Sequence, residues 1–136
     1  MTPELVVPVD MADDIVVARE AGRDLARRLG FSLTDVTMIA TAISEMTRNI
    51  TSYAEKGEVR FYVEIRKRRS VLVVEAADQG PGIEHIERAL EDGYSTSGGL
   101  GLGLPGARRL MDEFEIRSED GVGTTVVMRK WAPLDA

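Results

Sequence analysis

The sequence predicts an α+β fold, a two-layer α/β sandwich in which helices cover one face of a mixed sheet. Three patterns predict it: helical periodicity near the start of the chain, two-residue alternation in the middle, and a helix followed by a hairpin near the end. The chain has 136 residues, which fits a single domain spanning residues 1–136. Its composition, 43% hydrophobic and 29% charged, is that of an ordinary globular protein.

The spacing of apolar residues and the positions of proline and glycine predict the first elements. Apolar residues alternate from Leu5 to Val9 and predict a short edge strand that Pro8 interrupts. Residues 13–29 place their apolar side chains on one helical face, and Gly30 follows as a stop signal. These patterns predict one strand and one helix before residue 31.

A second helix begins near Ser32, which forms a capping pair with Asp35 three residues later. Its apolar residues recur at helical spacing and predict a face buried against the rest of the protein. They are Val36, Ile39, Ala40, Ile43, Thr47 and Ile50.

The rest of the chain alternates between strand and helix patterns. Residues 59–65 and 71–77 predict two strands, and the basic run at residues 66–69 between them is interpreted as a solvated hairpin turn. Later segments predict a short helix at 84–91, a third helix at 104–113, and two final strands at 115–118 and 124–130.

Composition and charge exclude several classes of function. The net charge is -6, and the one basic run is short, so no nucleic acid partner is expected. The chain has no cysteine, which excludes disulfides and thiolate metal sites. No apolar run approaches the roughly 18 residues of a membrane span, so we expect no membrane association and a cytoplasmic location.

The second helix carries the first candidate site residues. Glu45 and Asn49 are four residues apart and therefore lie on one face, which points away from the apolar stripe. The same face carries Met38 and Ala42, and this combination indicates the wall of a pocket. The alternative is that the Glu–Asn pair is ordinary surface polarity.

The second candidate is the segment Asp78-Gln79-Gly80-Pro81-Gly82, directly after a strand that looks buried. Gly80 and Gly82 permit backbone angles and close approaches that other residues resist. An Asp at a strand end can accept a hydrogen bond from an exocyclic amine while a flat ring lies against the glycines. The alternative is a tight turn capped by the Asp side chain.

The third candidate is a glycine-rich segment that ends in a predicted helix. Backbone N–H groups of such a segment can face an anion, and the start of a helix adds unpaired donors. The glycines are Gly99, Gly101 and Gly103, and the preceding hydroxyls are Ser95, Thr96 and Ser97. A G-x-G-x-x-G match at 101–106 lacks the preceding strand of a dinucleotide fold, and the P-loop lysine is missing, so both of those motifs are rejected.

Taken in order, the three segments resemble the N, G1 and G2 boxes of the GHKL ATPase superfamily, which implies the Bergerat ATP-binding fold. The segments AISEMTRNI (42–50), ADQGPGI (77–83) and EDGYSTSGGLGLGLPGARRLMDEF (91–114) are similar to RsbT-like serine/threonine kinases, the switch proteins of the bacterial stressosome. The resemblance extends over nearly the whole chain.

The resemblance also implies a role for each residue. Asn49 would hold Mg²⁺ against the triphosphate of ATP, and Glu45 would act as general base or orient the acceptor hydroxyl. Asp78 would bind the adenine amine, with Gly80 and Gly82 shaping that pocket. Residues 84–98 would form a short lid, with His85 on its surface, and Arg48 would lie near the triphosphate. The phosphates would contact Ser95, Thr96, Ser97, Gly99, Gly101 and Gly103.

The implied function is a protein serine/threonine kinase acting on STAS-domain stressosome proteins. Such a kinase would also bind and activate a PP2C-type phosphatase once released. One alternative is an anti-sigma factor kinase acting on an anti-anti-sigma STAS protein. Another is a module in which ATP only sets the shape for partner switching, and the presence of Glu45 argues against it because nucleotide binding alone needs no carboxylate there.

Overall fold

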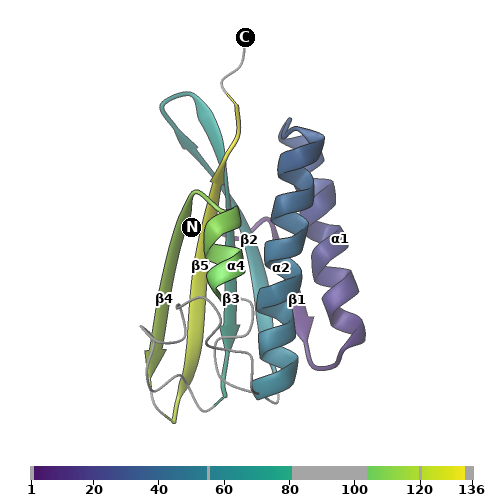
Figure 1. Cartoon of the computed structure of the whole chain (residues 1–136), viewed down its shortest axis with the longest axis vertical. Coiled ribbons are helices and arrows are strands. Elements are labelled where there is room, and N and C mark those ends of the chain that lie inside the picture. Colours follow the sequence, from purple (N-terminus) through teal and green to yellow (C-terminus); the bar gives the residue numbers. More distant parts are fainter. Residues whose placement is uncertain (1, 55, 81–103, 120, 134–136) are drawn as a thin grey trace.

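A computed structural model describes residues 2–54, 56–80, 104–119 and 121–133, and it confirms the predicted α+β class. Helices lie on one side of a five-stranded sheet (Figure 1). The elements in chain order are β1 (Leu5–Val9), α1 (Asp13–Arg28), α2 (Leu33–Tyr53), β2 (Gly57–Arg66), β3 (Arg69–Asp78), α4 (Leu104–Leu110), β4 (Glu113–Glu119) and β5 (Gly123–Trp131).

The strand order is β1-β2-β3-β5-β4, and every pairing in the described sheet is antiparallel rather than mixed. The reason lies in the connections. Hairpins join β2 to β3 and β4 to β5, while α1 and α2 form a helical pair that returns the chain to the end of the sheet where β1 stops. Strand β2 therefore runs opposite to β1.

Local signals in the sequence set the helix boundaries as predicted. Helix α1 is followed by Gly30, which adopts a φ of +85° that suits glycine. Helix α2 is capped by Ser32, whose hydroxyl accepts a hydrogen bond of 3.1 Å from the Asp35 amide. The basic turn between β2 and β3 is confirmed, with Lys67 and Arg68 both at positive φ.

The core lies between the helices and one face of the sheet. All six residues of the predicted α2 stripe are at most 3% exposed, so the periodicity identified the buried face correctly. A Cβ at Gly22 of α1 would collide with Cδ1 of Ile43 on α2 and would lie 3.3 Å from the ring of Phe61 on β2, which is fully buried. Glycine at this position therefore allows α1 to pack closely against α2.

Two boundary predictions are wrong for physical reasons. Pro8 does not interrupt β1, because β1 is the edge strand and a residue without an N–H is tolerated there. The helix predicted at 104–113 ends at Leu110, and β4 begins already at Glu113. The amide of Asp112 donates a 2.9 Å hydrogen bond to the carbonyl of Arg129, which joins the chain to the sheet at this point.

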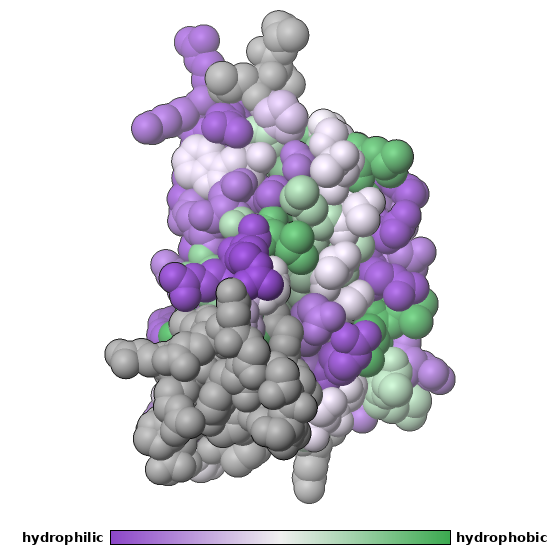
Figure 2. All heavy atoms as spheres, in the orientation of Figure 1, coloured by the Kyte–Doolittle hydropathy of each residue, from purple (hydrophilic) through white to green (hydrophobic). Residues whose placement is uncertain are grey.

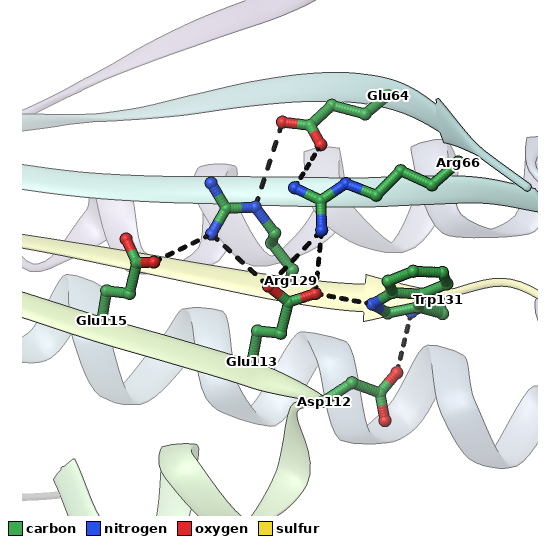
Figure 3. Close-up of polar contacts among 7 residues, drawn as sticks. All are labelled: Glu64, Arg66, Asp112, Glu113, Glu115, Arg129 and Trp131. Carbon is green, nitrogen blue, oxygen red and sulfur yellow. Dashed lines mark hydrogen bonds and ion pairs between the residues drawn. The ribbon is translucent and has the colours of Figure 1, made fainter.

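The opposite face of the sheet carries a charged network, drawn in Figure 3, and a small apolar cluster. Arg66 donates to Glu113 at 3.1 Å, and Arg129 lies between Glu64 and Glu113 at 3.9 Å from each. The indole N–H of Trp131 donates to Glu113 at 2.8 Å. The apolar cluster consists of Val71, Val73 and Val127, and Trp131 packs against it.

The surface seen from the side of Figure 1 is mainly hydrophilic, with hydrophobic side chains in separate small patches (Figure 2). None of the helices in the described ranges is long and apolar enough to cross a membrane. The short helix predicted at 84–91 lies outside the described residues.

Candidate nucleotide-binding site

The best-defined part of the candidate site is the end of β3. Asp78 is the last residue of that strand and is half-buried. Its Oδ1 accepts hydrogen bonds from the amide of Gly80 at 2.9 Å and from the amide of Thr124 on β5 at 3.2 Å. The Gly80 contact is the capped turn that the sequence offered as an alternative, and it leaves Oδ2 without a hydrogen-bond donor among the described residues.

Two glycines let neighbouring strands approach Asp78 closely. A Cβ at Gly123 would collide with the carbonyl oxygen of Asp78, and this glycine has a φ of +149°. A Cβ at Gly57, the β2 partner of Asp78, would lie 3.1 Å from the Asp78 Cα and would collide with the carbonyl of Ala77. The Asp78 backbone is therefore enclosed by the two neighbouring strands, β2 and β5.

The C-terminal part of α2 lies over this strand end. A Cβ on Gly57 would be 2.9 Å from Cγ2 of Ile50, which follows Asn49 directly in α2. Asn49 is half-buried, and Figure 1 shows that α2 and β3 both end at the same end of the molecule. The end of α2, which carries Asn49, and the end of β3, which carries Asp78, thus lie at the same end of the molecule although the two residues are 29 positions apart in the sequence.

Glu45 lies one turn before Asn49 on α2 and has a partner in Arg48. The Arg48 guanidinium donates to Oε1 of Glu45 at 3.2 Å, so Arg48 lies beside the carboxylate, which is 32% exposed. Glu45 opens onto a groove of about 440 Å³ between α1 and α2. The charged groups that line this groove with Glu45 are Arg19, Glu20, Arg23 and Arg48.

The other residues predicted on this helix face have a different role. Ala42 is fully buried in the core instead of lining a pocket. Met38 is partly buried, and its sulfur lies 3.8 Å from the ammonium of Lys130. Packing of α2 against α4 and the sheet explains the apolar character of this face.

Two cavities adjoin Asp78 from the side of the charged sheet face. Their volumes are about 310 and 590 Å³, and both are lined by Arg60, Ala77, Asp78 and Gln79. Arg60 is held by hydrogen bonds to Glu58 and Glu75. The bond to Glu58 is the main cause that raises the pKa of Arg60 above its ordinary value, against the opposing effect of burial. Arg60 therefore keeps its charge at any physiological pH.

The structure also reveals site residues that the sequence analysis missed. Pairing of β2 and β5 with β3 brings three residues next to Asp78, namely Gly57, Gly123 and Thr124. They belong to no short sequence motif that would have predicted this position. The predicted residues Gly82, Ser95, Thr96, Ser97, Gly99, Gly101 and Gly103 lie outside the described residues.

The residues present fit a nucleotide and a magnesium ion. Asp78 is fixed through one carboxylate oxygen, and among the described residues the other has no donor, so it could accept from an exocyclic amine. The described residues contain no cluster of three His, Cys, Asp or Glu side chains that could hold a metal by themselves. Mg²⁺ in nucleotide sites takes few protein ligands besides phosphates and water, so one amide from Asn49 suits it.

Comparison with known proteins agrees with this geometry. The histidine kinase-like ATPase domain family matches residues 8–130. The chain is 51% identical over 118 residues to the serine/threonine-protein kinase RsbT of Bacillus subtilis, covering 87% of this chain and 89% of the relative. It is 33% identical to the anti-sigma F factor of Clostridium acetobutylicum, covering 83% of this chain and 82% of that protein.

Solved structures share the fold at lower identity. The mycobacterial sensor histidine kinase MprB superposes with a TM-score of 0.57 at 21% identity, covering 96% of this chain and 100% of that one. The catalytic domain of histidine kinase ThkA gives a TM-score of 0.54 at 16% identity, covering 93% and 95%. The family match and the RsbT identity, both extending over most of the chain, establish that this protein belongs to the histidine kinase-like (GHKL) ATPase family and, within it, to the RsbT-like serine/threonine-protein kinases.

Proposed function

We propose that this kinase transfers the γ-phosphoryl group of Mg-ATP to a Ser or Thr of STAS-domain stressosome proteins. We further propose that, once released from them, it binds and activates a PP2C-type phosphatase. The observation that carries the catalytic part is the position of α2, which holds Glu45 and Asn49 one turn apart while its C-terminal end lies over Asp78. This position of α2 supports the proposal that a base, a metal ligand and an adenine acceptor act together in a single domain spanning 1–136.

Each residue has a defined task in this reaction. Oδ2 of Asp78, which has no donor among the described residues, accepts a hydrogen bond from the adenine amine, and Gly80 and Gly82 give the ring room. Glu45 receives the proton of the acceptor hydroxyl as its oxygen bonds to the γ-phosphorus. The bond between that phosphorus and the β,γ-bridging oxygen breaks, and ADP leaves. Arg48 holds the Glu45 carboxylate in place beside the triphosphate.

Charge neutralisation comes from the metal and the glycine-rich segment. Mg²⁺, held by the Asn49 amide, would neutralise the phosphate oxygens. We propose that Gly99, Gly101 and Gly103 direct backbone amides to the phosphates and that Ser95, Thr96 and Ser97 add hydroxyl donors. Phosphoryl transfer depends mainly on such positioning and electrostatic stabilisation, so this set suffices without a covalent intermediate.

The groove between α1 and α2 supports an approach of the acceptor protein beside Glu45. An acceptor hydroxyl must come within hydrogen-bond reach of the carboxylate, and Glu45 opens onto this groove. Arginines from both helices line the groove, where Arg23 pairs with Glu20 and Arg48 pairs with Glu45. We propose the cytoplasm as the compartment, because the reaction consumes ATP.

A second candidate function is that of an anti-sigma factor kinase acting on an anti-anti-sigma STAS protein. The 33% identity to anti-sigma F factors favours it, although the identity to RsbT is higher. A third reading, an ATP-dependent switching module without catalysis, would need no base at position 45.

The test is incubation of the purified protein with γ-labelled ATP, Mg²⁺ and, separately, a stressosome STAS protein and an anti-anti-sigma STAS protein. We expect label on Ser or Thr of the stressosome protein. Label only on the anti-anti-sigma protein would establish the second candidate. A phosphatase assay with and without the kinase tests activation of the PP2C-type partner. Absence of label on either acceptor, with ATP still bound, would favour the non-catalytic module.

A further inference from the structure

Lys130 is a lysine with a buried ammonium group in the interior of the fold. It lies on β5 with 9% of its surface exposed, and its side chain is on the face of the sheet that the helices cover. A buried ammonium is costly unless it is paired and hydrogen-bonded. The hydrogen-bond and ion-pair partners of the Lys130 ammonium therefore indicate which elements it joins.

The strongest contact of Lys130 is with the end of α4. Its Nζ donates a hydrogen bond of 2.7 Å to the carbonyl oxygen of Leu110, the last residue of that helix. The carboxylate of Asp112 lies 4.0 Å from the same nitrogen. A cation at a helix C-terminus meets unpaired carbonyls and the negative end of the helix dipole, which compensates for its burial.

Lys130 also contacts the other helix of the candidate site. The Met38 sulfur of α2 is 3.8 Å from Nζ, and Met38 precedes Glu45 by two helical turns. One ammonium thus touches α2, which carries Glu45 and Asn49, and α4, which starts at Leu104 directly after the glycine-rich segment.

Helix α4 has only 7 residues; Leu104 and Ala107 bury it in the core, and Lys130 contacts its C-terminus. Helices this short are unstable by themselves and depend on tertiary contacts. Two further hydrogen bonds join the same corner to β5, from the Asp112 amide to the Arg129 carbonyl and from the Trp131 amide to the Asp112 carboxylate at 2.8 Å (Figure 3). Of these contacts, only that of Lys130 reaches α4 itself.

We propose that Lys130 is a positioning residue for nucleotide binding. It fixes the C-terminus of α4 relative to α2, and α4 begins at Leu104, directly after the glycine-rich segment that is proposed to bind the phosphates. Lys130 itself does not touch ATP. This inference rests on the proposed function, since it assumes that the segment before α4 binds the phosphates.

The test is Lys130→Met, which keeps the length of the side chain and removes the charge and the donor. We expect the Kd and the KM for ATP to rise by up to about tenfold, the limit set by the free energy of the one charge-assisted hydrogen bond that holds α4. At saturating ATP, kcat should change by no more than about twofold, since Glu45 and Asn49 stay in place. Lys130→Arg, which retains a charged donor, should restore part of the affinity.

The matched control is Arg129→Met, which removes the same charge from the adjacent residue on the opposite face of the sheet. Arg129 pairs with Glu64, Glu113 and Glu115, and its loss should lower stability without changing the KM for ATP. Denaturant unfolding, followed through Trp131, the single tryptophan, gives the stability of each variant. The inference is overturned if folded Lys130→Met binds ATP like the wild type, or if Arg129→Met raises the KM equally.

The same measurements also cover a Lys130→Met variant that fails to fold and a wild type that binds ATP without transferring phosphate. If Lys130→Met does not fold, Lys130→Gln replaces it, with an expected rise in KM of about threefold or more; an unchanged KM in that variant overturns the inference. ATP titration needs no acceptor protein. A wild type that binds ATP but labels no STAS protein would therefore count against the proposed function alone.

Discussion

The carboxylate of Asp78 at the end of β3 accepts a hydrogen bond of 3.2 Å from the backbone amide of Thr124 on β5, 46 residues further along the chain. This contact fixes the side chain from an adjacent strand and not only from its own turn. An acceptor held in this way needs little reordering when a ligand arrives, which reduces the entropic cost of binding.

Replacement of Asp78 by asparagine should weaken ATP binding. The amide would place a donor or a neutral acceptor where the proposed contact to the adenine amine needs a carboxylate oxygen, so we expect the Kd to rise about ten- to a hundredfold. Isothermal titration with ATP measures this effect. Asp10→Asn is the control, because Asp10 lines a cavity beside Asp78 on the other face of the sheet. Equal affinity in wild type and Asp78→Asn would remove Asp78 from the adenine site.

Replacement of Glu45 by glutamine should abolish most of the transfer while nucleotide remains bound. Loss of a general base typically costs about 10²- to 10⁴-fold in rate. Single-turnover transfer of labelled phosphate to the acceptor protein gives this number, and ATP titration shows whether binding is intact. Glu20→Gln is the matched control, since Glu20 lines the same groove from α1. Transfer by Glu45→Gln at the wild-type rate would rule out the base role.

Alanine at Gly123 should disturb both stability and nucleotide binding. Its Cβ would collide with the Asp78 carbonyl at an unfavourable φ, so we expect a loss of about 3 kcal/mol in the free energy of unfolding. Gly121→Ala is the control, because Gly121 also has positive φ but has open space around it. That variant should lose only about 1 kcal/mol and keep its affinity for ATP. The prediction fails if the two alanine variants behave alike in both measurements.

Removal of the α2 cap by Ser32→Ala should lower the free energy of unfolding by about 1 kcal/mol, because the Asp35 amide loses its acceptor. Urea unfolding monitored by Trp131 fluorescence is the measurement. Thr34→Ala, at an exposed position in the first turn of the same helix, should change stability by less than about 0.5 kcal/mol. A loss in Thr34→Ala as large as in Ser32→Ala would argue against the cap.

The sequence by itself predicted most of the helices and strands that the structure describes, and it identified the buried stripe of α2. The α2 stripe, the Ser32 cap, the Gly30 stop and the basic hairpin turn were all predictable, because each depends on residues within a few positions of one another. Glu45, Asn49 and Asp78 could be nominated for the same reason, since their motifs are short and contiguous.

Only the tertiary structure decided which distant residues contact them. The antiparallel pairing of all strands, the end of α4 at Leu110 and the proximity of Gly57, Gly123 and Thr124 to Asp78 depend on contacts between distant segments. The burial of Lys130 under two helices belongs to the same class, because a lysine in a strand pattern ordinarily indicates a solvated position. Such contacts arise from the packing of helices on a sheet, and local periodicity contains no information about which distant partner completes them.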